Sequence, residues 1–246
     1  MAPPFPYAGY SEDVVRRVRV LFGGKFVVDA QKPKLVWEHP YFPCYYFPKS
    51  AVSFDHLQNA RLLEDSSKEK LYYDLVVGDR TAEAAVILFQ DGPFKDFVKV
   101  VFDKADAWFE EDERVYAHPK DPYKRIQIFP SSKHVRVEID GVEVANTRKP
   151  KLLYETGLPI RYYIPMTDVR LDLLTPSDSV TTCPYKGDAS YFDITLPSTG
   201  AKKEGLVWWY KTPTLESAEI RGHVAFYDEK LDVWVDGVKQ ERPVTK

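Results

Sequence analysis

The stretch Lys149-Pro150-Lys151-Leu152-Leu153-Tyr154-Glu155 has a close counterpart earlier in the chain, Lys32-Pro33-Lys34-Leu35-Val36-Trp37-Glu38. The same offset of 117 residues aligns residues 18–57 with residues 135–174 without a gap, and 16 of the 40 aligned positions are identical. Similarity of a chain to itself at a fixed offset indicates a repeated structural unit. An offset this long predicts two paired domains rather than a solenoid of short repeats.

The match extends from this segment towards both ends of the chain. After a two-residue gap, Tyr72-Tyr73-Asp74-Leu75 aligns with Tyr191-Phe192-Asp193-Ile194, and near the ends Asp106-Ala107-Trp108 aligns with Asp232-Val233-Trp234. We therefore expect a leading arm at residues 1–17, a first domain at residues 18–133 and a second domain at residues 134–246. The oligomeric state stays unknown at this point.

Each copy has the local pattern of β-strands. Residues 135–145 alternate apolar and polar side chains on both sides of Asp140-Gly141, which is typical of a β-hairpin. The 16 Tyr and 14 Phe favour pleated sheets, and the 19 Pro disfavour helix interiors. We expect helix only at residues 11–17 and 95–101. The predicted fold class is all-β, with two tandem domains of mostly antiparallel sheet and little helix.

The composition argues against several classes of protein. The formal net charge is −3 without a basic stripe, so we expect no nucleic-acid partner. No apolar run approaches the length of a membrane span, and the N-terminus lacks the regions of a signal peptide, so we expect a cytoplasmic protein that does not bind membranes. The two cysteines and the scattered histidines show no metal-ligand spacing. We therefore expect no metal and no cofactor.

The second copy contains a candidate functional loop, Thr182-Cys183-Pro184-Tyr185-Lys186-Gly187-Asp188. A sharp turn here would bring the Cys183 thiol near the Lys186 ammonium, which would favour the reactive thiolate. Alternatively, Lys186 holds an anionic ligand while Gly187 lets the backbone approach it closely. A third interpretation is an ordinary turn with a buried thiol and a solvated lysine.

Comparison of the two copies distinguishes this loop from the scaffold. The loop aligns with Glu64-Asp65-Ser66-Ser67-Lys68, Arg161 aligns with Cys44, and His223 aligns near Lys99. Trp208-Trp209 has Leu88-Phe89 in the corresponding region. Because several polar and aromatic positions differ together while the apolar pattern persists, we infer one functional site and one copy that has lost it. Drift in a surface loop is the competing explanation.

Three further residues are candidates for the same site. Glu155, which Glu38 matches in the first copy, is a general base, a ligand contact or a structural ion-pair partner. Arg161 offers a planar bidentate fork for a carboxylate or phosphate, or is simply solvated. His223 begins a predicted strand after a glycine, and its ordinary pKa suits proton transfer, although a lone histidine is usually structural.

The second copy resembles the DUF427 family, a domain family of unknown function that is sometimes labelled nucleotidyltransferase-like. The resemblance rests on Glu155-Thr-Gly-Leu-Pro-Ile-Arg-Tyr-Tyr-Ile-Pro165, on Thr182-Cys-Pro-Tyr-Lys-Gly187 and on Gly222-His-Val-Ala-Phe-Tyr227. The first copy is similar to the degenerate N-terminal half of the family's tandem members, with Trp37-Glu38 and Tyr45-Tyr46 retained.

The resemblance implies a β-tent fold, similar to that of Mss4-like proteins and methionine sulfoxide reductase B. Several proteins with that fold carry a four-cysteine zinc site, from which this sequence departs. Others place a small ligand in an aromatic pocket on the open face of the sheet. The sequence has no Gly-rich phosphate loop and no paired acidic metal motif to support the nucleotidyltransferase label. Fold analogy is in any case weak evidence for function.

Three functional hypotheses follow for the second domain, and whether it is an enzyme is left open. In the first, it binds a small polar or anionic molecule: Tyr163, Tyr185, Tyr191 and Trp208 form aromatic walls, while Arg161, Lys186, Gly187, Glu155 and His223 orient the ligand. In the second, it is a transferase- or hydrolase-like enzyme with Cys183 as nucleophile or Glu155 and His223 as acid and base. In the third, the tandem is a structural or protein-interaction unit without a useful pocket beside Lys186. We favour binding.

Overall fold

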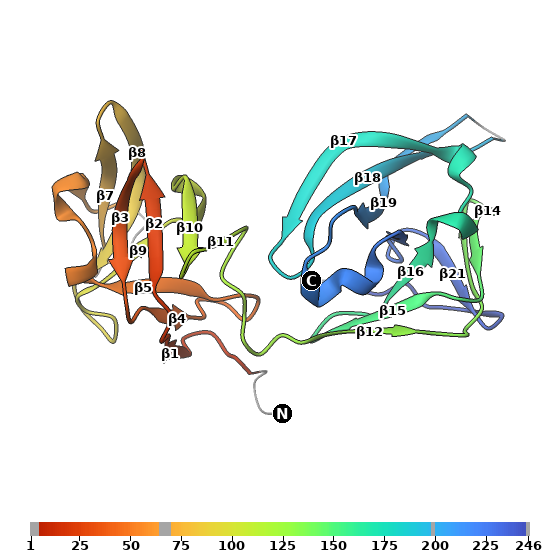
Figure 1. The fold of residues 1–246 in the computed structure, drawn as a ribbon, viewed down its shortest axis with the longest axis horizontal. Helices are drawn as coiled ribbons and strands as arrows, with labels where there is room; N and C mark the ends of the chain where they lie inside the picture. Colours follow the sequence, from red (N-terminus) through yellow and green to blue (C-terminus); the bar gives the residue numbers. More distant parts are fainter. Residues whose placement is uncertain (1–4, 64–69, 198–199, 245–246) are drawn as a thin grey trace. The chain divides into compact units, whose positions relative to one another are not determined.

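The computed structural model describes residues 5–63, 70–197 and 200–244 (Figure 1). It divides into two compact units, Met1–Asp121 and Pro122–Lys246. The division falls before the expected start of the second domain, because β12 (Ile126–Pro130) pairs along its whole length with β15 (Lys151–Glu155). The expected leading arm contributes β1 (Ser11–Asp13), which pairs with β4 (Lys34–Val36).

The first unit contains two antiparallel sheets. The larger has seven strands in the order β1-β4-β5-β9-β8-β7-β6, and the smaller has four in the order β11-β10-β2-β3. The strands not yet given are β2 (Val18–Phe22), β3 (Lys25–Ala30), β5 (Cys44–Pro48), β6 (Leu57–Arg61), β7 (Lys70–Val77), β8 (Arg80–Phe89), β9 (Phe97–Val100), β10 (Ala107–Glu110) and β11 (Glu113–Val115).

The second unit repeats this arrangement. Its larger sheet runs β12-β15-β16-β20-β19-β18-β17 and its smaller sheet runs β14-β13-β21-β22. The remaining strands are β13 (Val135–Ile139), β14 (Val142–Thr147), β16 (Arg161–Pro165), β17 (Leu174–Cys183), β18 (Gly187–Thr195), β19 (Lys202–Tyr210), β20 (His223–Phe226), β21 (Asp232–Val235) and β22 (Val238–Lys239).

Equivalent strands occupy the same place in the larger sheet of each unit, so the duplication seen in the sequence is a duplication of topology. The prediction of an all-β, mostly antiparallel fold in two similar domains is confirmed. The finer assignment to a β-tent fold stays a prediction.

Helix among the described residues is confined to short 3₁₀ segments, namely η1 (Lys49–Ala51), η2 (Phe54–His56), η3 (Phe102–Lys104), η4 (Met166–Asp168), η5 (Leu171–Leu173) and η6 (Leu215–Ile220). Both predicted helices were wrong. Residues 11–13 form β1 at a sheet edge, where pairing with β4 outweighs local preference. Residues 97–100 form β9, whose side chains alternate between half-buried and buried as a strand requires.

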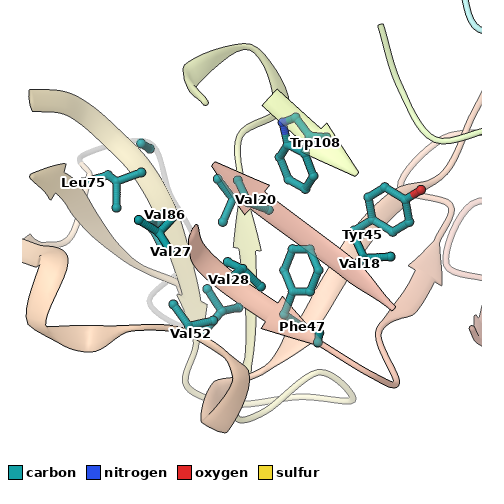
Figure 2. Packing of buried hydrophobic residues seen from close by; sticks show 14 of the residues in the cluster. Val18, Val20, Val27, Val28, Tyr45, Phe47, Val52, Leu75, Val86 and Trp108 are labelled. Carbon is teal, nitrogen blue, oxygen red and sulfur yellow. The ribbon is translucent and has the colours of Figure 1, made fainter. Parts of the chain in front are cut away.

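Apolar side chains from both sheets of the first unit meet in one core. Val18, Val20, Val27 and Val28 point from the smaller sheet towards Phe47 and Val86 of the larger one (Figure 2). Most of this core is β-branched or aromatic, the residue types that pack best on a pleated surface.

The larger sheet of the second unit is apolar on both faces. One face, with Ile164, Val207 and Val224, packs on the smaller sheet. The opposite face carries a second cluster that includes Tyr163, Trp208 and Tyr210. Successive side chains of a strand point to opposite faces, so Trp208 and Tyr210 belong to the second cluster while Trp209 stacks on Phe192 against the first.

A buried aspartate stabilises a bulge at the same point of both larger sheets. Asp74 accepts a hydrogen bond from the backbone N–H of Ala84, and Asp193 accepts one from that of Gly205, each at 2.8 Å. Ala84 and Gly205 both have positive φ, at 47° and 59°. Glycine adopts this conformation at little cost, whereas alanine is strained in it.

Within the part of the chain that the structure describes, no helix combines the length and apolar character needed to cross a membrane.

Candidate functional site

A pocket of about 180 Å³ opens on the second apolar face of the larger sheet in the second unit, and we refer to it as the Trp208 pocket. It is lined by Leu153, Glu155, Leu158, Pro159, Arg161, Tyr163, Lys186, Tyr191, Trp208, Tyr210 and Tyr227. The lining thus combines aromatic rings with three charged side chains. It is supplied by β15, the β15–β16 loop, β16, the β17–β18 turn, β18, β19 and the segment after β20.

The first charged group of the pocket is a buried ion pair. Glu155 ends β15, and Lys186 lies in the tight turn between β17 and β18, where Cys183 pairs with Gly187. The Lys186 ammonium donates a hydrogen bond to Glu155 Oε2 at 2.5 Å, and the side chains of Lys186 and Glu155 are only 12% and 8% exposed. Two charges this buried need each other, since either alone would lose hydration without compensation.

The second charged group is Arg161, the first residue of β16. Its guanidinium forms a bidentate ion pair with Glu229 and lies 3.7 Å from Asp228 Oδ2. Its charged end also lies over the Trp208 ring, 5.6 Å from the centroid. The ion pairs raise the pKa of Arg161 although burial opposes this, so the residue remains a fixed cation.

The carboxyl group of Asp228 is buried and lies 3.7 Å from the Arg161 guanidinium. Burial raises its pKa to about 7, and nearby Glu229 also raises it, while Arg161 acts in the opposite direction. Asp228 does not line the Trp208 pocket. It lines a neighbouring cavity of about 170 Å³ that includes Tyr162 and Glu241.

Tyrosine hydroxyls supply most of the remaining polar atoms of the pocket. The Tyr191 hydroxyl shares a hydrogen bond with Thr181 Oγ1 at 2.8 Å. The Trp208 and Tyr227 rings lie against each other, with centroids 4.6 Å apart. Burial raises the pKa of Tyr163, Tyr210 and Tyr227, so these phenols stay protonated and able to donate.

The structure brings together Glu155, Arg161, Tyr163, Lys186, Tyr191 and Trp208 from the predicted set. Tyr185 and Gly187 lie apart from them. Tyr185 is buried, and its carbonyl accepts hydrogen bonds from the hydroxyls of Thr214, just before η6, and Ser217 of η6. Gly187 has φ of +96°, and a Cβ there would lie 3.3 Å from the Thr212 carbonyl. Its backbone therefore approaches its own chain rather than a ligand.

The three groups proposed for catalysis are not assembled. Cys183 packs at the margin of the aromatic cluster and does not line the pocket, and Lys186 is occupied by Glu155. His223 pairs with Pro165 and bonds the Arg221 carbonyl, and burial lowers its pKa. It neighbours Lys151, four residues along β15 from Glu155, which is about 13 Å of strand. Glu155 and His223 therefore cannot act as one acid–base pair in this arrangement.

The first unit neutralises the equivalent glutamate with a different lysine. Glu38 pairs with Lys99 of β9 at 2.5 Å and also accepts a hydrogen bond from Tyr46. The strand registers place Phe97 at the position of His223 and Lys99 at the position of Ala225. This corrects the sequence alignment of His223 with Lys99 by two residues. In the second unit the lysine that pairs with the glutamate is Lys186 of the β17–β18 turn, so the sheet position that Lys99 fills in the first unit holds only the small side chain of Ala225.

Aromatic side chains pack over the equivalent face of the first unit. Phe94 contacts both Tyr46 and Phe89, and the Tyr46 and Phe89 rings stack with centroids 4.8 Å apart. Ile87 and Phe89 correspond to Trp208 and Tyr210, which shifts the sequence alignment of Trp208-Trp209 by one residue. The counterpart of the β17–β18 turn, residues 64–68, lies outside the described residues.

Sequence reasoning missed Tyr210, Tyr227 and the counter-ions Asp228 and Glu229. Tyr210 was accessible to it, because the side chain two residues after Trp208 on one strand must share its face. Glu229 had no such signal, since only the fold brings it to Arg161. Among the residues that the structure describes, no group of three or more His, Cys, Asp or Glu side chains could hold a metal ion.

Comparison with known proteins assigns the chain to a family. The model of the domain of unknown function DUF427 matches residues 11–111 and, a second time, residues 127–237. The two matches coincide with the two structural units and cover most of the chain. No curated protein matches the chain. The chain therefore belongs to the DUF427 family and carries two copies of its domain in tandem.

Proposed function

We propose that the second domain binds a small polar or anionic molecule in the Trp208 pocket. The observation that carries this proposal is the convergence of aromatic rings and fixed charges on one cavity: Trp208, Tyr191 and Tyr227 wall it, while Arg161 and Lys186 contribute cations. Concave, mostly apolar sites with a few well-placed polar groups are typical of small-molecule binding.

The size of the cavity limits the ligand to about one ring. A cavity of about 150 Å³ accommodates benzene, and drug-sized molecules occupy pockets of about 300 Å³ or more. The Trp208 pocket has about 180 Å³. We infer a ligand with a single planar ring or a short chain, stacked against the Trp208 and Tyr227 rings.

The charges favour an anionic over a cationic ligand. Two cations, Arg161 and Lys186, and one carboxylate, Glu155, line the pocket, while Glu229 pairs with Arg161 from outside the lining. Both cations are already held in ion pairs, so their positions are set before a ligand arrives.

Catalysis and a purely structural role receive less support from the geometry. The Cys183 thiol lies outside the pocket, and Glu155 and His223 are too far apart to exchange a proton directly. A structural or interaction unit has no need of a cavity beside Lys186. We further propose that the first domain serves as a scaffold, since Phe94 packs on the face where the second domain has its pocket.

We also propose that the protein works in the cytoplasm. Both Cys44 and Cys183 are free thiols, which suits a reducing compartment.

The test is a fluorescence and thermal-shift screen of single-ring acids, amides and amines against the full chain and two tryptophan variants. Trp208→Ile installs the residue that the first domain has at this position and removes the pocket wall. Trp209→Leu makes the matched change on the opposite face of the same strand. We expect compounds that bind the wild type and Trp209→Leu but bind Trp208→Ile at least tenfold more weakly. Equal binding to all three proteins would show that the pocket is not the site.

A further inference from the structure

The hydroxyl group of Tyr210 has no evident role in holding the fold together. Tyr210 is 5% exposed and lines the Trp208 pocket, yet none of the described residues forms a hydrogen bond with its hydroxyl. Tyr191, on the neighbouring strand, differs in this respect because its hydroxyl is bonded to Thr181. The Tyr210 hydroxyl nevertheless stays accessible through the pocket, because Arg19 Nε is the fully buried side-chain N or O atom that lacks a partner among the described residues. A ligand that enters the pocket can therefore accept a hydrogen bond from it.

The first domain shows that this position does not need a hydroxyl. Tyr210 pairs with Ala189 and Phe89 pairs with Lys70, at the same point of the two sheets. Phe89 packs on Tyr46 and Phe94 through its ring alone. A phenylalanine therefore suits the fold at this point, and the extra oxygen in the second domain faces the cavity that the first domain packs with rings.

The chemistry of the pocket defines what that oxygen would bind. Burial raises the pKa of Tyr210, which leaves a protonated phenol that donates a hydrogen bond. Trp208 and Tyr227 offer ring faces, and the lining presents two cations, Arg161 and Lys186, which Glu229 and Glu155 hold in ion pairs. A flat ligand that carries a negatively charged acceptor can stack on these rings, accept a hydrogen bond from the Tyr210 hydroxyl and lie beside the two cations.

We propose that the ligand of the second domain is a small planar carboxylic acid whose carboxylate accepts a hydrogen bond from Tyr210. This inference rests on the proposed function and narrows it to one substrate class. Tyr210 is then the residue that selects a hydrogen-bond acceptor, while the aromatic walls select a flat ring.

The first experiment needs no ligand. The thermal midpoints of the free wild type, Tyr210→Phe and Tyr191→Phe are compared, with hydrogen exchange of peptides from the second unit to localise unfolding. Loss of the bonded Tyr191 hydroxyl should lower the midpoint by a few degrees. Loss of the unbonded Tyr210 hydroxyl should leave it unchanged or raise it. A fall in Tyr210→Phe as large as in Tyr191→Phe would show that the Tyr210 hydroxyl is structural and would overturn the inference.

The second experiment measures binding of 4-fluorobenzoate and 4-fluorobenzamide by fluorine NMR. These probes share a ring and an acceptor oxygen but differ in charge. We expect the wild type to bind the benzoate more tightly than the amide, and Tyr210→Phe to lose at least tenfold in benzoate affinity. Tyr154→Phe, a matched change at an exposed tyrosine of β15, should keep wild-type affinity.

The outcomes separate this inference from the proposed function. The assignment of a carboxylate to Tyr210 would be overturned if Tyr210→Phe bound the benzoate as tightly as the wild type does. It would also be overturned if the wild type bound the amide as tightly as the benzoate. If Trp208→Ile still abolishes that binding, the proposed pocket stands. If neither probe binds the wild type at millimolar concentration, the acid class is wrong, and the wider screen with Trp208→Ile and Trp209→Leu decides on the pocket itself.

Discussion

Lys186→Met should destabilise the second unit strongly, because it leaves the Glu155 carboxylate buried without its counter-ion. The side chains of the pair are 12% and 8% exposed, so solvent compensates little for the lost contact. Removing one partner from a buried ion pair typically costs about 3–5 kcal/mol of unfolding free energy. We expect a loss of about 3 kcal/mol, since the pocket admits some water to the site.

A double variant and a matched pair in the first unit make the reasoning specific. Lys186→Met with Glu155→Gln removes both charges, and its stability should return to within about 1 kcal/mol of the wild type. Lys99→Met breaks the equivalent pair in the first unit, where Glu38 is 33% exposed, and should cost about 1 kcal/mol because the pair is better hydrated.

The assay is urea unfolding monitored by hydrogen exchange, with peptides from residues 174–195 reporting on the second unit and peptides from residues 70–89 on the first. If Lys186→Met is no less stable than the double variant, the reasoning is refuted, because the buried Glu155 carboxylate would then not need its counter-ion.

The remaining predictions concern titration and backbone strain. Because burial raises the Asp228 pKa to about 7, from 3.8, the folded state holds a proton between these values that the unfolded state releases. The contribution of Asp228 to stability therefore falls as pH rises from 4 to 7, by an amount of order 4 kcal/mol. Asp228→Asn should remove this dependence, and urea midpoints measured between pH 4.5 and 8 would contradict it if both proteins changed in parallel. Gly205→Ala should cost about 1 kcal/mol, because an alanine with positive φ is strained where nothing else crowds its Cβ. Ala84→Gly should recover a similar amount in the first unit, and calorimetry showing opposite signs for the two changes would contradict this account of the bulge.

The duplication and the fold class were accessible from the sequence for a physical reason. Alternation of apolar and polar side chains predicts pleated strands directly, and the same pattern occurs in both copies of the repeat. The predicted helices failed where local pattern was weak. The polar residues 11–13 become a strand only because the β4 edge is available to pair with them.

The candidate site was partly predictable because differences between the copies separate scaffold from site. Arg161, Lys186 and Trp208 were found this way and line one pocket. Tyr210 was missed because the alignment of β8 with β19 was displaced by one residue, which hid the exchange of Phe89 for Tyr210. The connection between the paired residues Thr195 and Lys202 is two residues longer than that between Val76 and Thr81, and the sequence alignment accounted for only one of these two residues.

The loop between β17 and β18 illustrates a second limit. Its residues Tyr185, Lys186 and Gly187 are adjacent in sequence but contact different parts of the structure. The Tyr185 side chain is buried, the Lys186 ammonium reaches Glu155, and the Gly187 backbone contacts Thr212. Which way each side chain of a tight turn points depends on contacts with distant segments, here η6 and β15.

A crystal structure of the full chain grown with excess 4-fluorobenzoate tests the central claim most directly. We predict the fluorinated ring in the Trp208 pocket, against the Trp208 and Tyr227 rings, with its carboxylate within hydrogen-bond distance of the Tyr210 hydroxyl. An empty Trp208 pocket in crystals that hold the compound elsewhere would contradict the account.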